Sequence, residues 1–377
     1  MSKNKKETKS KDQVVLERIQ AEIDKIDKKE NKIFFFVLDT KGNPSGSLEY
    51  IYRLAHILHE KEYNVTMLYQ EEEEFVGVGE WMGEKYASLP HENIAKEETG
   101  VSPSDILFIP EIFANVMTQA KQLPCKKVAL LQNYDFISEQ LPLSIQWGDL
   151  NVMDALVNTV ENETLLKEIF PYVKTKVVPP YIDDLYHDTN EPKKMIVNIV
   201  SKDPSMVNRV VKPFYWTYPL FKWVTFRDLR GFSNEEFASK LKEGAITIWI
   251  DEVAPFGYSA LAAMKSGSLL LAKLANNRLP WATTETGEFI NGCTWFDNVR
   301  QLPQMIAQLV RAWVTNNQIA EEIVEEGKKI ANQYTKDKTE KELVEYIETL
   351  LSNRKDELHN LLLSIKGQKQ ETPKDNN

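Results

Sequence analysis

Cysteine is scarce in this chain. Only Cys125 and Cys293 occur among 377 residues, and they lie far apart in the sequence without a CxxC spacing. This pattern indicates neither a zinc site nor a disulfide framework. We therefore expect a protein of a reducing compartment, the cytoplasm.

Long apolar runs are also missing. No stretch approaches the roughly 18 apolar residues that a membrane-spanning helix needs. The N-terminus, MSKNKKETKSKD, is charged and is followed by no apolar core of a signal peptide. We expect neither a standard secreted protein nor an integral membrane protein.

Positive charge is not in excess. The chain has 46 Lys and Arg against 56 Asp and Glu, a formal net charge of −10. A protein built mainly to hold nucleic acid needs clustered cations to neutralise phosphates. We therefore expect no nucleic-acid partner.

The chain contains enough apolar sequence for two domains. At 377 residues and 42% hydrophobic residues, each of two domains is able to bury its own core. Short apolar runs alternate with helical patterns, which predicts an α/β fold with parallel sheets and crossover helices. The expected strands lie near residues 32–38, 65–69, 105–109, 127–131, 154–159, 176–180, 195–200, 223–227, 245–250 and 269–272.

A proline pair marks the predicted boundary between the domains. Residues 178–183, VPPYID, are forced into an extended path by Pro179 and Pro180. We expect a first domain over residues 32–183 and a second over 192–334.

Both chain ends are highly charged. Residues 1–31 predict a charged tail followed by an amphipathic helix, and residues 335–366 are helical by their period. These helices could lie on the protein surface, or they could contact a partner or a membrane peripherally. The helical pattern after residue 335 could also cross back onto the first domain. We expect residues 367–377 to form a disordered tail.

The most informative segment is residues 251–272, DEVAPFGYSALAAMKSGSLLLA. It predicts a loop, then a helix from Tyr258 to Lys265 that ends at Ser266 and Gly267, then a buried strand. The first turn of such a helix exposes backbone N–H groups and the positive end of the helix dipole, which together bind phosphate. The same pattern also fits an ordinary helix and strand without a ligand. The candidate binding residues here are Glu252, Phe256, Gly257, Tyr258 and Ser259.

This segment resembles the signature of GT-B glycosyltransferases, in particular the retaining group 1 or family 4-like enzymes. Their pattern is Glu-x-Phe-Gly followed by a helix that ends in Glu-Ala-Met-x-x-Gly. The matching residues are Phe256, Gly257, Ala263, Met264 and Gly267. Ala254 and Ala262 stand where the family has its two glutamates, the second of which commonly contacts the ribose of the nucleotide sugar. Asp251 and Glu252 lie just upstream of the first position.

The resemblance implies the GT-B fold, in which two Rossmann-like domains face each other across a cleft. Weaker matches follow in the same order. Residues 42–47 resemble the glycine-rich loop after the first strand and offer Gly46 and Ser47 as substrate contacts. Residues 128–135 resemble a strand whose end faces the cleft and add Asn133 and Asp135.

The resemblance also implies the chemistry. GT-B enzymes generally stabilise the departing diphosphate with cationic side chains and a helix dipole in place of a metal. Lys202 is our first candidate cation and Arg209 the second; with Asp135 they form the predicted catalytic set, with no metal and no further cofactor. We expect a hexosyltransferase-like enzyme that moves a sugar, with retention, from a nucleotide sugar to a glycan, lipid-linked or protein acceptor.

Two alternatives remain at this point. The absence of both family glutamates also fits a non-catalytic relative that serves as a binding or assembly module. A sugar-nucleotide epimerase on the same fold is disfavoured, because the sequence offers no clear set of a histidine and a carboxylate for acid and base catalysis.

Overall fold

The first sheet is built around one of the most apolar segments of the chain. A computed structural model describes residues 11–71, 73–96, 99–251, 256–274, 279–284, 286–315 and 318–368. Its first seven strands form one parallel sheet in the order β3-β2-β1-β4-β5-β6-β7. They are β1 (Lys32–Phe36), β2 (Asn64–Tyr69), β3 (His91–Asn93), β4 (Ile106–Pro110), β5 (Lys126–Leu131), β6 (Asp154–Val157) and β7 (Lys174–Val177).

Helices cover both faces of this sheet, so its central strands are apolar on both sides. In β1, Ile33 and Phe35 enter the core on one face while Phe34 and Phe36 enter the core on the other. The crossover helices are α2 (Gly46–Glu60), α3 (Gly79–Met82), α4 (Glu84–Ala87), α5 (Ala114–Ala120), α6 (Asp135–Gln140) and α7 (Val160–Ile169), with a 3₁₀ turn at Trp147–Leu150.

The second sheet has five parallel strands in the order β12-β11-β10-β8-β9. They are β8 (Lys194–Ser201), β9 (Thr225–Asp228), β10 (Gly244–Ile250), β11 (Leu269–Lys273) and β12 (Thr294–Phe296). Side chains of α9 (Asn234–Glu243) and α10 (Tyr258–Lys265) pack on one face, and those of α8 (Ser205–Thr217) and α11 (Leu302–Val314) on the other. The helix α12 (Gln318–Ala331) packs on α10 and β11.

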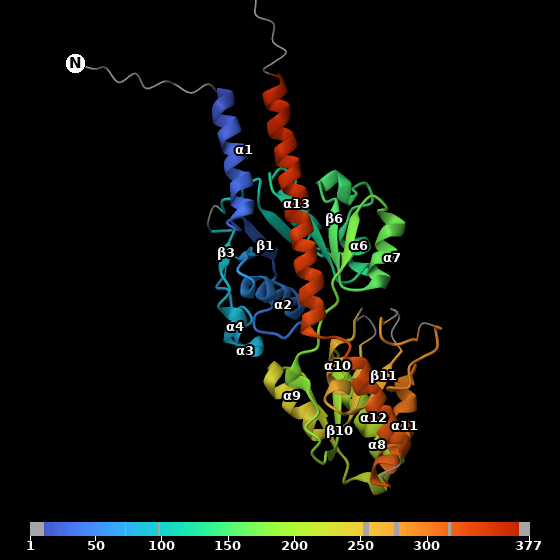
Figure 1. Cartoon of the computed structure of the whole chain (residues 1–377). Coiled ribbons are helices and arrows are strands. Elements are labelled where there is room, and N and C mark those ends of the chain that lie inside the picture. The colour runs from blue at the N-terminus through green and yellow to red at the C-terminus, as the bar shows by residue number, and fades with distance from the viewer. Residues whose placement is uncertain are drawn as a thin grey trace, which may run out of the picture.

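The chain passes between the two sheets twice. Residues 178–183 lead from β7 toward the second sheet, and residues 332–335 lead from α12 back to the first domain. The two passages are tied together, because Ile182 N donates to the Tyr334 carbonyl at 2.9 Å and the Thr339 hydroxyl donates to the Pro179 carbonyl at 2.7 Å. These bonded passages form the hinge segment between the domains (Figure 1).

The terminal helices lie side by side on the first domain, with their distal ends projecting beyond it (Figure 1). α13 (Lys336–Gln368) is one continuous helix that crosses back onto this domain, and it extends past the boundary at residue 366 that the sequence predicts. Its Leu343 and Ile347 enter the same core as Ile23 of α1 (Lys11–Asp27). Of the alternatives for the sequence after residue 335, the one in which the helix crosses back onto the first domain therefore holds.

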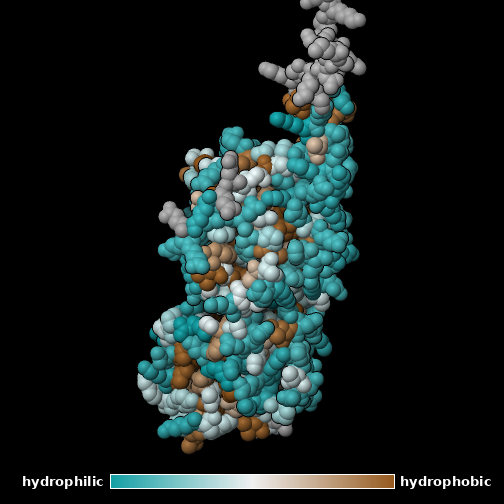
Figure 2. Space-filling view, turned by 90° about the vertical axis from the view of Figure 1, so that its left-hand side faces the viewer, coloured by the Kyte–Doolittle hydropathy of each residue, from teal (hydrophilic) through white to brown (hydrophobic). Residues whose placement is uncertain are grey.

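Apolar side chains remain exposed on both terminal helices, at Val15, Leu361 and Leu363. Figure 2 shows a mainly hydrophilic face with small apolar patches, some of them near the tip of the paired helices. Among the described helices, none is both long and apolar enough to cross a membrane.

Candidate functional site

A cavity of about 320 Å³ lies between the two domains. This volume falls within the usual range of small-molecule sites. The lining comes from the carboxyl-terminal side of both sheets, where open parallel sheets bind ligands. The first domain contributes Pro44, Ser45, Gly46, Ser47, Tyr50, Arg53, Gln132, Asn158 and Pro180, and the second contributes Lys202, Trp249, Asp251, Phe256, Gly257, Tyr258 and Ser259.

The N-terminus of α10 borders this cavity. Gly257 caps the helix with a φ of 71°, a left-handed conformation that disfavours any residue with a side chain. The Trp281 indole N–H donates to the Phe256 carbonyl at 2.7 Å and so holds the preceding loop. A Cβ atom at Gly257 would also lie 3.0 Å from the Trp281 ring. The left-handed Gly257 and the tertiary contact from Trp281 therefore fix this helix terminus at the cavity edge.

A second helix N-terminus faces the same cavity from the first domain. α2 begins at Gly46, and the Ser45 hydroxyl caps it by accepting a hydrogen bond from Leu48 N at 3.4 Å. A Cβ atom at Gly46 would meet no atom within 4 Å, so the space beside it is open. Each terminus carries the partial positive charge of a helix dipole. Their convergence makes the cavity suited to an anionic ligand.

Lys202 follows β8 and lines the cavity, but its charge is partly compensated. Its Nζ lies 3.1 Å from Oδ2 of Asp251, which follows β10. The Lys202 side chain is 83% exposed, whereas Asp251 is 13% exposed. An anion that binds Lys202 must therefore compete with Asp251 for this ammonium group.

The other predicted site residues lie elsewhere. Arg209 is an exposed residue of α8 that borders a separate hollow with Tyr218 and Arg300. Asp135 is exposed at the start of α6, where its backbone N–H donates to the Asn133 side chain at 3.1 Å. Neither Asp135 nor Asn133 belongs to the cavity lining.

The structure describes one of the two positions where the family has a glutamate. Glu252 and Ala254 lie outside the described residues. Ala262 is fully buried among the apolar side chains of the second domain. At this position the chain therefore offers a methyl group in a packed core and no polar contact to a ribose.

A buried carboxyl group supports one wall of the cavity. Glu111 follows β4, and its Oε1 accepts hydrogen bonds from the backbone N–H groups of Gln132 at 3.1 Å and Asn133 at 2.7 Å. Burial raises the pKa of Glu111 to about 7, although these two hydrogen bonds oppose the shift. Glu111 thus holds the loop that carries Gln132 to the cavity.

Sequence reasoning missed several lining residues, including Tyr50, Arg53, Gln132 and Asn158. Asn158 donates through its side chain to the Gln132 carbonyl at 3.1 Å, which connects the ends of β5 and β6. Gln132 and Asn158 each follow a buried strand, and Tyr50 and Arg53 belong to the helix after the first strand. These places in the sequence could have indicated that the residues face the cleft.

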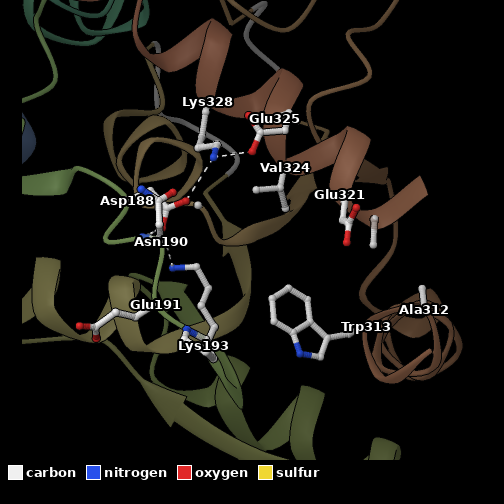
Figure 3. Close-up of a pocket in the computed structure, with 13 residues that line it drawn as sticks. Asp188, Asn190, Glu191, Lys193, Ala312, Trp313, Glu321, Val324, Glu325 and Lys328 are labelled. Carbon is white, nitrogen blue, oxygen red and sulfur yellow. Dashed lines mark hydrogen bonds and ion pairs between the residues drawn. The ribbon is translucent and has the colours of Figure 1, made fainter. Parts of the chain in front are cut away.

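A second cavity, of about 360 Å³, lies at the amino-terminal ends of strands of the second sheet (Figure 3). Its lining includes Lys193, just before β8, and Gly267, just before β11. Asp188 and Lys328 form an ion pair at 3.2 Å on one side, and Trp313 lies on another. None of the predicted site residues lines this cavity, so the interdomain cavity is the candidate site.

Metal ligands do not gather in the described part of the chain. Among those residues, no group of three or more His, Cys, Asp or Glu side chains is arranged to hold a metal ion. Independence from metal stays a prediction.

Comparisons with known proteins agree with this architecture. The chain matches no protein-family profile. An alpha-1,6-glucosyltransferase of Actinobacillus pleuropneumoniae serotype 7 (strain AP76) is 25% identical over 191 residues, which are 48% of this chain and 56% of that protein. The matched part thus spans little more than half the length of this relative.

Solved structures show the fold over a larger part of the chain. A sucrose-phosphate synthase from Thermosynechococcus elongatus superimposes with a TM-score of 0.59 at 12% identity, covering 86% of this chain and 100% of that one. The pneumococcal O-GlcNAc transferase GtfA, in complex with UDP and GlcNAc, gives a TM-score of 0.57 at 12% identity, covering 86% and 99%. The predicted GT-B fold, an α/β architecture of two parallel sheets, is confirmed.

Proposed function

We propose that this chain is a glycosyltransferase that takes a sugar from a nucleotide-sugar donor. The observation that carries the proposal is the convergence of two helix N-termini, of α2 and α10, on one cavity between the domains of a GT-B fold. The glucosyltransferase and O-GlcNAc transferase among the similar proteins support it.

In this proposal the second domain holds the donor. The α10 terminus at Tyr258 and Ser259 binds the diphosphate through backbone N–H groups and the helix dipole. During transfer, the bond between the anomeric carbon and the diphosphate oxygen breaks with its electron pair going to the diphosphate. A bond to the acceptor oxygen forms, and the acceptor hydroxyl passes its proton to the departing diphosphate. Lys202 then leaves Asp251 and binds the developing negative charge on the diphosphate.

The first domain then presents the acceptor, a glycan, a lipid-linked sugar or a protein. Gly46 and Ser47 lie on its side of the cavity, and the open space beside Gly46 admits a ligand. We further propose that the sugar is transferred with retention of its anomeric configuration and that the reaction needs no metal. The two cysteines are free and buried, in agreement with a reducing, cytoplasmic setting. A partner or membrane surface contacts the exposed apolar residues of the terminal helices.

A transfer assay tests this function. Wild-type protein is incubated with UDP-, GDP-, ADP-, CDP- and dTDP-sugars and a mixture of candidate acceptors, and the released nucleoside diphosphate is measured with magnesium or with EDTA. We expect release from one donor class at equal rates in both conditions. NMR of the product's anomeric centre then tests retention. No release from any donor would contradict the proposal.

A non-catalytic binding module is the second candidate. It is favoured by the alanines at positions 254 and 262 and by the pairing of Lys202 with Asp251. This candidate predicts that the cavity binds no nucleotide, or binds one without any transfer.

A further inference from the structure

Arg53 occupies the junction of the two domains. It belongs to α2, and only 4% of its side chain is exposed. Its Nη2 donates to Oε1 of Glu49 at 2.6 Å, and its Nη1 donates to the Tyr181 carbonyl of the hinge segment at 3.2 Å. A second hinge residue, Asp183, places Oδ2 at 3.9 Å from Nη2. Arg53 thus joins α2 to the chain passage between the domains.

The same pair of charged groups also contacts the second domain. The guanidinium carbon of Arg53 lies 5.1 Å from the ring centre of Tyr258, the first residue of α10. Across the junction, the side-chain amide of Asn234, the first residue of α9, donates to Oε1 of Glu49 at 3.0 Å. One buried ion pair therefore contacts the first residue of α9 and the first residue of α10.

The charge of Arg53 is not free to bind an anionic ligand. Arg53 borders the cavity, but the buried carboxylate of Glu49 lies at hydrogen-bond distance and compensates its charge. Arg53 is therefore less available to a diphosphate than Lys202, whose side chain is exposed although Asp251 pairs with it. Buried ion pairs are poor sources of stability, and their best-supported role is to fix geometry.

We propose that Arg53 is a positioning residue that, with Glu49, latches α9 and α10 of the second domain against α2 and so sets the width of the interdomain cavity. The latch breaks when the domains separate, because Asn234 and Tyr258 move away from the Arg53–Glu49 pair together. Its effect on turnover rests on the proposed function, whereas its effect on domain geometry does not.

The test measures the distance between the domains. Spin labels are placed on cysteines introduced at two exposed positions, Glu84 of α4 and Ser239 of α9, one in each domain. Distances are recorded in the wild type, in Asn234→Ala and in Arg53→Lys. The matched control is Asn208→Ala, which removes an exposed amide of α8 that takes no part in the latch. Native Cys125 and Cys293 are buried and protected from the label.

We expect a single short distance in the wild type and in the control. Loss of one hydrogen bond to a charged acceptor should raise the ratio of open to closed molecules about tenfold in Asn234→Ala, and Arg53→Lys should broaden the distances at least as much. Asn234 lies partly exposed at the start of α9, so its truncation leaves the buried ion pair in place. The Asn234→Ala variant therefore tests the latch even if Arg53→Lys does not fold.

Turnover gives the second measurement. Because α10 binds the donor within one domain, Asn234→Ala should lower kcat in proportion to the loss of closed molecules, and it should change kcat more than the donor KM. Folded variants whose label distances match the wild type would overturn the latch, whatever their activity. Absence of nucleotide binding and transfer in the wild type would instead refute the proposed function, and the label distances would still judge the latch.

Discussion

Glu111 makes the stability of this protein depend on pH. Its carboxyl group is buried, and its pKa is raised to about 7 from an ordinary value of 4.5. In the folded protein the group keeps its proton up to about pH 7, whereas in the unfolded chain it releases the proton near pH 4.5. The folded state therefore binds more protons between these values, and the free energy of unfolding falls as pH rises from 4.5 to 7.

The size of this fall follows from the shift. A difference of about 2.5 pH units, at 1.36 kcal/mol per unit, gives about 3 kcal/mol of stability lost above pH 7. Glu111→Gln removes the titration but keeps an oxygen that accepts from Gln132 N and Asn133 N. Relative to wild type, the variant should gain about 3 kcal/mol of unfolding free energy on going from pH 4.5 to pH 8.

Urea unfolding at half-unit steps between pH 4.5 and pH 8.5 measures this difference. Any constant cost of the amide cancels, because only the change with pH enters the comparison. Glu139→Gln is the matched control, since it makes the same chemical change at an exposed residue of α6. Parallel curves for Glu111→Gln and wild type would refute the reasoning.

Lys202→Ala should lower turnover more than donor affinity, which steady-state kinetics would reveal. Asp251→Asn should tighten nucleoside diphosphate binding roughly threefold in calorimetry, because it frees Lys202. A weaker complex in Asp251→Asn would count against the assignment of this ion pair. Gly257→Val should lower the free energy of unfolding by about 2 kcal/mol, because the φ of 71° at this position and the Trp281 ring leave no place for a branched side chain. A melting temperature equal to that of the wild type would disprove this. Arg209→Ala should leave nucleotide affinity within about twofold of wild type, because Arg209 borders a different hollow; a large loss of affinity would return it to the site.

Signals confined to one stretch of sequence predicted their structures well. The helix expected from Tyr258 to Lys265 is α10, and Gly267, with a φ of 72°, stands just past its end as a left-handed residue does. The buried strand after it is β11. These features depend on residues within a few positions of each other, so local propensity was sufficient.

Elements with little local pattern escaped prediction. The edge strands β3 and β12 have three residues each, too few to show a period. α7 has only two buried residues, Asn162 and Leu166, so its helical period was weak.

Side chains that meet only through tertiary packing escaped prediction as well. Glu49 and Arg53 looked like an ordinary pair one turn apart on α2, and nothing in the sequence places Asn234 beside them across the domain junction. Lys202 and Arg209 had similar sequence support, yet one follows the strand end at the cavity and the other lies further along α8, beside another hollow. The direction of a helical side chain depends on what its helix packs against.

Nucleotide binding by the wild-type protein tests the central claim most directly. Calorimetric titration with UDP, GDP, ADP, CDP and dTDP, each with and without magnesium, measures whether the interdomain cavity accepts a nucleoside diphosphate. The account predicts that one nucleotide binds with the same affinity in both conditions, and that Lys202→Ala weakens it. Absence of binding by all five at millimolar concentration would contradict a nucleotide-sugar site between these domains.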